Sequence, residues 1–203
     1  MAYLIAIGLG YLLGSSNLAY WLAKWNNVDF RKGGSGNLGA SNTTILLGWK
    51  AGVFVGIHDI GKAVLAVVLA KLLFPEQEYV GAAAGVSAVL GHVFPFYLRF
   101  KGGKGLASFL GMVAALNWKV GLAIAALLVL ITLVTDFISL GTLTVSVAAP
   151  VGIFLATGKI LLPLILAVAS VVLIFKHIEN IHRLLNKTEI GLRSTIKGEN
   201  RVK

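Results

Sequence analysis

The fold is decided by residues 120–175, which read VGLAIAALLVLITLVTDFISLGTLTVSVAAPVGIFLATGKILLPLILAVASVVLIF. Only two residues in this stretch are charged, Asp136 and Lys159, and they divide it into three apolar runs. About 20 consecutive apolar residues in a helix are enough to cross the hydrocarbon core of a bilayer. Each run therefore predicts one membrane-spanning helix, and the stretch as a whole predicts an all-α membrane protein.

Four further apolar segments precede this stretch and bring the predicted number of spans to seven. In chain order, the seven segments are approximately Ala2–Ala23, Gly52–Phe74, Val80–Leu98, Leu106–Leu116, Val120–Val134, Phe137–Ala156 and Ile160–Phe175. The fourth segment is only about 16 Å long as a helix, at 1.5 Å per residue. Because the hydrocarbon core is about 30 Å thick, we expect this short helix to be shielded by its neighbours or to thin the bilayer locally.

The composition agrees with a membrane protein. Hydrophobic residues make up 57% of the chain and charged residues 13%, and a soluble chain of this size needs a larger polar shell. The formal net charge of +10 is therefore expected at a membrane surface rather than on nucleic acid. The chain has no cysteine, which excludes disulfides and thiolate metal sites. We predict one integral membrane domain, residues 1–203, with a short basic cytoplasmic tail from about residue 177.

The basic residues predict the orientation, because cytoplasmic loops carry an excess of lysine and arginine. Three regions hold 14 of the 18 basic residues. They are the loop between spans one and two (Lys24, Arg31, Lys32, Lys50), the loop between spans three and four (Arg99, Lys101, Lys104) and the tail (Lys176, Arg183, Lys187, Arg193, Lys197, Arg201, Lys203). Seven crossings place all three regions inside, with the N-terminus outside and the C-terminus in the cytoplasm.

Two cytoplasmic segments are rich in glycine: residues 33–42 read GGSGNLGASN and residues 100–105 read FKGGKG. Glycine lets backbone N–H groups approach an anion closely. Each segment also precedes a predicted helix, whose positive N-terminal end favours a bound anion. Glycines in membrane proteins often serve helix packing alone, but here they are clustered with Ser35, Asn37 and two lysines. This clustering favours phosphate binding.

Polar residues near the ends of two spans are candidates for the same site. His92 lies near the cytoplasmic end of span three, beside the second glycine-rich segment, and can act as a base, a hydrogen-bond donor or a packing residue. His177, Asn180 and Arg183 are spaced i, i+3, i+6, which places them along one helix face. That face is either a solvated basic surface or the wall of a pocket formed by the glycine-rich loops. His182 and Glu189 are expected at the surface.

Asp59 and Lys62 lie within span two and can pair at i, i+3. Ionisable residues inside a membrane usually face a cavity or each other. The pair is therefore a neutral structural pair, a source of positive charge for a pocket, or part of the permeation path of a transporter or channel. His58 is expected to point elsewhere around the helix. Most polar features cluster at one face of the membrane, and this favours an interfacial enzyme over a transporter, whose sites lie near the midplane.

Three motifs carry a resemblance to a known family. GGSGNLGASN (33–42), GHVFPFYLRFKGGKG (91–105) and HIENIHRL (177–184) resemble, in this order, the three cytoplasmic signatures of the bacterial acyl-phosphate:glycerol-3-phosphate acyltransferases. The pair Asp59 and Lys62 also resembles a family feature. The resemblance covers most of the chain. It departs from the family at Ile45, where members often carry an arginine.

The resemblance implies transfer of a fatty acyl group from acyl phosphate to the 1-hydroxyl of glycerol 3-phosphate, giving lysophosphatidic acid and phosphate in phospholipid biosynthesis. It implies a multi-pass protein of the bacterial cytoplasmic (inner) membrane with its active site at the cytoplasmic face. The implied partners are the two substrates, membrane lipids and the soluble enzyme that supplies acyl phosphate. No nucleic acid and no cofactor are expected, and the scattered carboxylates of Asp29, Asp59 and Asp136 predict no metal site.

The residues that match the motifs form the predicted site. The catalytic residues are His92, Lys104 and Ser35; the substrate-binding residues are Gly34, Gly36, Asn37, Asn42, Lys101, Gly102, Gly103, His177, Asn180 and Arg183; the candidate pocket charges are Asp59 and Lys62. We assign Ser35, Gly36, Asn37 and Asn42 to acyl phosphate, with Lys104 bridging, and His177, Asn180 and Arg183 to glycerol 3-phosphate, although the two assignments can be exchanged.

The chemistry needs orientation, loss of a proton from the attacking hydroxyl and stabilisation of an oxyanion. The base is either His92 or a phosphate oxygen of the substrate, and the sequence leaves both open. A covalent acyl-serine is not expected, because Asn37 stands where a G-x-S-x-G motif around Ser35 needs its last glycine.

Overall fold

The structure is a computed structural model that describes residues 1–197, and all regular structure in this part of the chain is helical. The long helices are α1 (Ala2–Ser15), α4 (Trp49–Leu73), α5 (Val80–Val93), α6 (Leu106–Leu116), α7 (Trp118–Thr135), α8 (Ile138–Thr157) and α9 (Leu161–Lys176). The short helices are α2 (Leu18–Trp25), α3 (Ala40–Leu47), η1 (Phe96–Leu98), α10 (Ile178–Leu185) and α11 (Leu192–Lys197). The all-α prediction is confirmed. Arg201 and Lys203 of the predicted tail lie outside the described residues, as does the side chain of Lys197.

Five helical segments are long and apolar enough to cross a membrane, and they number six if α9 and α10, which meet at 47°, count as one. The five are Ala2–Trp25, Trp49–Leu73, Val80–Leu98, Trp118–Thr135 and Ile138–Thr157. The 11 residues of α6 are apolar but too few to meet this criterion. Together with α6, the six candidates coincide one to one with the seven apolar segments of the sequence.

The first apolar segment is interrupted, whereas the sequence predicts it as continuous. α1 ends at Ser15, and the side chain of Asn17 accepts the N–H of Tyr20 at 2.8 Å, which caps the N-terminus of α2. The carbonyl oxygen of Ser16, released by this break, accepts a hydrogen bond from Lys62 in α4. The break therefore supplies an acceptor to the buried charges described below.

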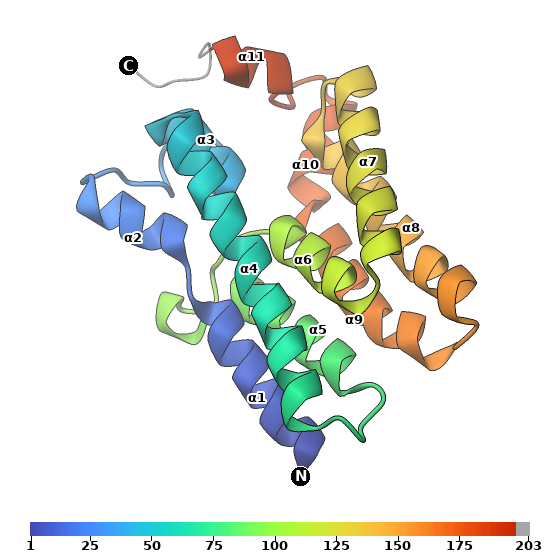
Figure 1. The fold of residues 1–203 in the computed structure, drawn as a ribbon. Coiled ribbons are helices and arrows are strands. Elements are labelled where there is room, and N and C mark those ends of the chain that lie inside the picture. Colours follow the sequence, from blue (N-terminus) through green and yellow to red (C-terminus); the bar gives the residue numbers. More distant parts are fainter. Residues whose placement is uncertain (198–203) are drawn as a thin grey trace.

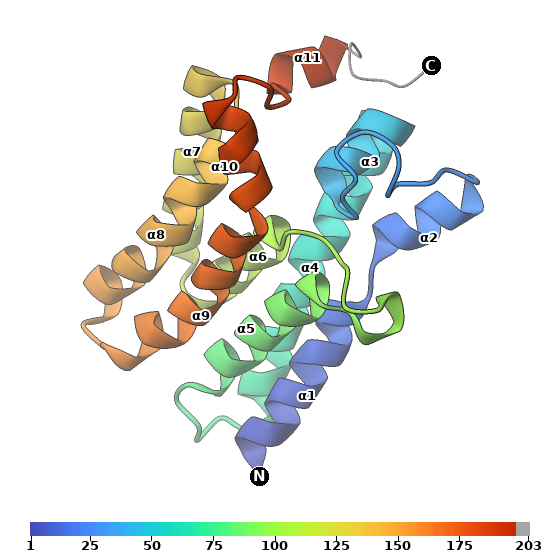
Figure 2. The same ribbon diagram turned by 180° about the vertical axis from the view of Figure 1, so that it is seen from behind.

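The long helices form two groups of three. α1, α4 and α5 pack on one another, α7 packs on α8, and α8 packs on α9; α6 contacts α4, α5 and α7 and so joins the groups. Figure 1 shows the N-terminus and the turn after α4 at one end of the molecule, with α3 and α11 at the other. Seen from behind, the chain between α5 and α6 crosses from the side of α1 and α2 toward α6 (Figure 2).

α5 is the central helix, and 12 of its 14 residues are buried. Its small residues let α1 approach closely: a Cβ at Gly14 of α1 would lie 2.0 Å from the carbonyl oxygen of Ala88. Conversely, a Cβ at Gly91 would lie 2.3 Å from the carbonyl oxygen of Tyr11. Helices in membranes associate through such backbone contacts. This packing sets the position of His92, which occupies the last turn of α5.

Candidate active site

The turn after α5 is built by a proline and two glycines. α5 ends at Val93, and Pro95 cannot continue the helix because it lacks an N–H. The carbonyl oxygens of His92 and Val93 accept instead from the N–H groups of Gly103 at 3.1 Å and Gly102 at 2.9 Å. The second glycine-rich loop therefore folds back over the end of α5.

No side chain fits at Gly102 or Gly103 of this loop. A Cβ at Gly102 would lie 2.0 Å from the carbonyl oxygen of His92, and a Cβ at Gly103 would lie 2.1 Å from Nε2 of the same residue. Glycine at 103 also approaches the carbonyl oxygen of Leu38, in the first glycine-rich loop. The two loops thus meet above the imidazole of His92.

The other nitrogen of His92 faces a buried ion pair. Asp59, Lys62 and His92 are 2%, 6% and 3% exposed. The ammonium group of Lys62 has three donors, and it lies 2.8 Å from Oδ1 of Asp59 and 2.7 Å from the carbonyl oxygen of Ser16. The third donor reaches Nδ1 of His92 at 2.9 Å. Each donor of the lysine therefore has its own acceptor.

This geometry determines the tautomer of His92. Oδ1 of Asp59 is 3.4 Å from Nδ1 of His92, which is longer than the 2.9 Å contact with Lys62. Nδ1 consequently accepts from the lysine, and the proton of the neutral ring is on Nε2. His58 also contacts Asp59, at 3.4 Å, so the prediction that His58 points elsewhere was wrong; its Nε2 lies 3.3 Å from Oγ of Ser16.

The first glycine-rich loop is shaped by Asn42 of α3. Its Oδ1 accepts the N–H of Ser35 at 2.7 Å, and its Nδ2 lies 2.9 Å from the carbonyl oxygen of Asn37 and 3.1 Å from that of Phe30. Gly34 has φ +58°, and a Cβ there would lie 2.2 Å from Oδ1 of Asn42. Asn42 is 0% exposed. In this structure the side chain of Asn42 therefore positions the backbone of the loop, and its predicted contact with substrate stays a prediction.

Two cavities bring most of the predicted site residues together. The inner cavity, of about 160 Å³, is lined among others by Asn37, Asp59, His92, Lys104 and His177. The outer cavity, of about 440 Å³, is lined among others by Ser35, Gly36, Asn37, Gly102 and Lys104. Asn37 and Lys104 line both cavities. Lys104 is therefore placed where groups bound in the two cavities would meet.

Lys104 is positioned by side chains of α10 and of the segment that follows α10. Its Nζ donates to Oδ1 of Asn180, whose Nδ2 donates to Oε1 of Glu189 at 2.6 Å. The other oxygen of Glu189 accepts from Nε of Arg183 at 2.7 Å. The side chain of Glu189 is only 7% exposed, so the prediction of a surface position was wrong; the chain after α10 brings this carboxylate against Asn180 and Arg183. His182 is exposed, as predicted.

Burial and neighbouring charges alter the acidity of these groups. Burial and, to a lesser extent, the positive charge of Arg183 lower the pKa of Lys104 to about 8. Burial raises the pKa of Glu189, but the hydrogen bonds from Asn180 and Arg183 outweigh it, and the net pKa lies below the usual value. Lys104 is therefore a cation at neutral pH that a nearby phosphate would stabilise.

His177 has the opposite tautomer from His92. Its Nδ1 lies 2.7 Å from the carbonyl oxygen of Leu173 and donates to it. Burial lowers the pKa of His177 to about 4, so the ring is neutral at pH 7 and Nε2 is an acceptor. The inner cavity is therefore lined by one histidine that can donate from Nε2 and one that can accept at Nε2.

Lys101 was predicted to bind substrate, and Ile45 was noted as a departure from the family. The side chain of Lys101 is exposed and lines neither cavity; its carbonyl oxygen accepts from Arg31. Ile45, at the position where the related family often has arginine, is 3% exposed and lines a cavity of about 50 Å³ together with Arg183. The cation near this position is therefore supplied by α10.

Arg31 and Lys176 line the outer cavity and were not among the predicted site residues. The signal for Arg31 was its place two residues before the first glycine-rich loop. Lys176 ends α9 and its Nζ lies 5.9 Å from the centre of the Phe94 ring. No local pattern distinguishes it from the other basic residues of the tail.

The chain is similar to known proteins over nearly its whole length. The sequence matches the family described as glycerol-3-phosphate acyltransferase over residues 4–187. It is 37% identical to glycerol-3-phosphate acyltransferase 1 of Oceanobacillus iheyensis, over 96% of this chain and 97% of that protein. It is 36% identical to the glycerol-3-phosphate acyltransferase of Prochlorococcus marinus strain MIT 9301, over 95% of this chain and 98% of that protein.

Two solved structures are similar to the whole fold. Both are described as PlsY (YgiH), an integral membrane glycerol 3-phosphate acyltransferase. The glycerol 3-phosphate form matches with a TM-score of 0.89 and 35% identity, over 94% of this chain and 96% of that chain. The lysophosphatidic acid form matches with a TM-score of 0.87 and 33% identity, over 97% of this chain and 100% of that chain.

Proposed function

This chain belongs to the glycerol-3-phosphate acyltransferase family, and we propose that it transfers a fatty acyl group from acyl phosphate to the 1-hydroxyl of glycerol 3-phosphate. The products are lysophosphatidic acid and inorganic phosphate. The observation that carries the proposal is the position of Lys104, shared by two cavities lined with phosphate-binding groups. A single cation at this junction can stabilise charge on both substrates.

Acyl phosphate binds in the outer cavity. Its phosphate accepts from the hydroxyl group of Ser35, the side-chain amide of Asn37 and the ammonium group of Lys104, and Gly36 lets it approach the loop closely. Arg31 adds a second cation to the same cavity. Glycerol 3-phosphate binds toward α10, where Arg183 supplies the cation. Arg183 thereby takes the place of the arginine that the family often has at position 45.

The roles of the two histidines follow from their tautomers. His92 presents N–H at Nε2, because Lys62 occupies its Nδ1, so it donates a hydrogen bond to the developing oxyanion rather than taking a proton. His177 accepts at Nε2 and orients the attacking hydroxyl. With a pKa of about 4, His177 is too weakly basic to remove the proton efficiently. A phosphate oxygen of the substrate therefore serves as the base.

The reaction is a direct transfer. The hydroxyl oxygen of glycerol 3-phosphate attacks the acyl carbon, and the carbon–oxygen bond to phosphate breaks. The hydroxyl proton moves to the phosphate group, which leaves as inorganic phosphate. Lys104 and the N–H of His92 stabilise the charge that develops as these bonds change. Atoms and charges balance without a metal or a covalent acyl-enzyme.

The membrane arrangement completes the proposal. The chain is one domain that crosses the bacterial inner membrane seven times, with the N-terminus outside and the C-terminus in the cytoplasm. α6 is the short crossing, and its contacts with α4, α5 and α7 support it where it falls short of the bilayer. Both glycine-rich loops and α10 are at the cytoplasmic face, where acyl phosphate arrives from the soluble enzyme that makes it. Asp59 and Lys62 neutralise each other as a buried ion pair.

The test is acyl transfer by the purified chain in liposomes. Release of phosphate should require both acyl phosphate and glycerol 3-phosphate, with lysophosphatidic acid formed in equal amount. Lys104→Ala should cost at least about 2 kcal/mol of transition-state stabilisation, whereas Lys32→Ala, with its side chain 88% exposed, should be silent. Solute flux without product, or equal activity of both variants, would contradict the proposal.

A further inference from the structure

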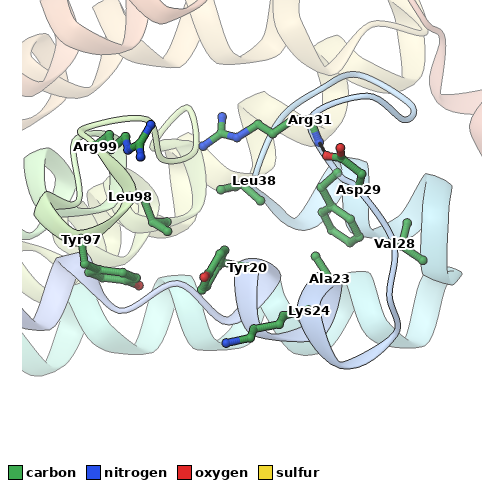
Figure 3. A pocket seen from close by; sticks show the side chains of 11 residues that line it. Tyr20, Ala23, Lys24, Val28, Asp29, Arg31, Leu38, Tyr97, Leu98 and Arg99 are labelled. Atoms are coloured by element: carbon green, nitrogen blue, oxygen red, sulfur yellow. Dashed lines mark hydrogen bonds between the residues drawn. The ribbon is translucent and has the colours of Figure 1, made fainter.

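Another cavity, of about 360 Å³, lies between α2 and the turn that contains η1 (Figure 3). We call it the α2 cavity. Arg31 lines both this cavity and the outer cavity, and no other residue lining the α2 cavity lines the inner or the outer one. The α2 cavity is thus a separate space that touches the site through one side chain.

The rim of the α2 cavity is positively charged. Lys24, Arg31 and Arg99 line it, with Asp29 as the sole carboxylate. Asp29 accepts a hydrogen bond from the backbone N–H of Arg31 at 2.9 Å. Its carboxylate also lies 3.9 Å from the ammonium group of Lys32, which does not line the cavity and partly neutralises the negative charge. In Figure 3 the guanidinium groups of Arg31 and Arg99 point toward each other. Two like charges held in this way favour an anion between them.

Arg99 is available for such an anion. It makes no hydrogen bond or ion pair with any residue between 1 and 197 for which the structure describes the side chain. Its backbone has φ +53°, and that of Phe100 has φ +58°, a conformation that costs energy in residues with a side chain. This pair of left-handed residues turns the chain between η1 and the loop of Lys104.

The floor of the α2 cavity is apolar and its surroundings are aromatic. Ala23, Phe30 and Leu38 are buried beneath it. Large aromatic side chains are exposed on α2 and around η1: Trp21, Trp25, Phe96, Tyr97 and Phe100. Aromatic residues of this kind concentrate at the level of lipid headgroups. The cavity therefore combines cations with apolar surface at the depth where a lipid phosphate lies.

We propose that the α2 cavity binds the phosphate headgroup of an anionic membrane lipid, at a site separate from the catalytic cavities. Arg31 and Arg99 hold the phosphate from two sides, since guanidinium groups match phosphate oxygens. Lys24 approaches from α2, and the apolar floor takes the glycerol and first methylene groups. Basic pockets on the cytoplasmic side of membrane proteins commonly recognise anionic headgroups.

The experiment measures binding without using activity. The full chain in neutral detergent is titrated with short-chain phosphatidylglycerol, with phosphatidylcholine of the same chain length and with inorganic phosphate, and its unfolding temperature is recorded. A ligand that binds the folded state raises this temperature. Phosphatidylglycerol should raise it with saturation, and phosphatidylcholine should not. In the Lys24→Gln/Arg99→Gln double variant the half-saturating concentration should rise at least about tenfold.

Two variants complete the test. Lys50→Gln is the matched control, because Lys50 lies 5.9 Å over Trp49 much as Lys24 lies 5.7 Å over Trp21, but does not line the α2 cavity. It should bind like the parent chain, and so should Lys104→Ala. An unchanged half-saturation in the double variant, an equal effect of phosphatidylcholine, or loss of the effect in Lys104→Ala would overturn the proposal. If inorganic phosphate alone raised the unfolding temperature as much as phosphatidylglycerol does, the ligand of the cavity would be free phosphate and not a lipid.

Discussion

At the scale of single residues, the chemistry depends on how Lys62 distributes its three protons. The ammonium group has one acceptor for each N–H, and the third acceptor is Nδ1 of His92. A lysine at 6% exposure is costly unless it is paired and hydrogen-bonded. The arrangement that neutralises this charge also fixes the proton of the histidine on Nε2, the ring nitrogen that lies against Gly103. In the proposed mechanism, one cluster therefore has both a structural and a catalytic role.

The tautomer of His92 predicts different effects for two substitutions. In His92→Gln the amide can accept from Lys62 and still donate into the cavity, whereas His92→Leu can do neither. We expect Gln to cost about 1–3 kcal/mol of transition-state stabilisation and Leu to cost more, because it also leaves a buried charge underbonded. The acid limb of the kcat profile should persist in His92→Gln, since substrate phosphate titrates near pH ~6.

Steady-state kinetics of both variants between pH 5 and 9 provide the check, with pH values chosen around the ~6.5 reference pKa of histidine. Equal activity of the Gln and Leu variants, with the acid limb gone from both, would mean that His92 is the general base.

The pKa of Lys104 leads us to expect a basic limb in the pH profile of kcat/KM. Its pKa of about 8 means that the free enzyme loses this cation as the pH rises through 8. The value of kcat/KM, which reports the free enzyme, should therefore fall above pH 8. An arginine stays charged throughout this range, so Lys104→Arg should have lower activity but no limb near pH 8. A limb that persists unchanged in the arginine variant would assign it to another group.

At the scale of helices, the site depends on close backbone contacts that position α5. α1 approaches α5 at Gly14, where a Cβ would lie 2.0 Å from the carbonyl oxygen of Ala88. α6 approaches α4 at Gly111, where a Cβ would lie 2.4 Å from the carbonyl oxygen of Ile60. Because helices in lipid gain little from hydrophobic burial against one another, such contacts carry much of their association. Their loss should affect both stability and His92.

Two glycines of α1 provide a test and a control for the role of the contact between α1 and α5. Gly14→Ala should separate α1 from α5, lower the unfolding temperature and reduce activity, because the new Cβ collides with backbone rather than with a flexible side chain. Gly8→Ala should be tolerated, since nothing lies within 4 Å of a Cβ at that position. Thermal unfolding and acyl transfer are measured for both. Equal unfolding temperatures in the two variants would show that this contact does not control the packing.

At the scale of the whole molecule, the proposed orientation places the glycine-rich loops and the turn after α4 on opposite sides of the membrane. The chain has no cysteine of its own, so single cysteines at the exposed positions Lys32, Lys101 and Gln77 report their sides directly. We expect an impermeant thiol reagent to label the first two only from the cytoplasm and the third only from outside. Labelling of Gln77 and Lys101 from the same side would exclude an odd number of crossings between them.

The sequence determined the helical class and the identity of most groups around the cavities. Membrane-crossing helices are predictable because the required apolar length is a property of consecutive residues. The glycine-rich loops are predictable for a similar reason. The backbone freedom of glycine and the positive charge of Lys104 are properties of the individual residues and do not depend on tertiary contacts. Even the i, i+3 pairing of Asp59 and Lys62 follows from helix geometry.

The tertiary structure decided how these groups are used. The burial of Asn42 and Glu189, the tautomers of His92 and His177, and the entry of Arg31 into the outer cavity depend on contacts between segments far apart in the chain. Such contacts arise only when helices pack, because packing sets which donors meet which acceptors and how much water each side chain retains. Local patterns describe the groups that are available, and packing assigns each of them its partner.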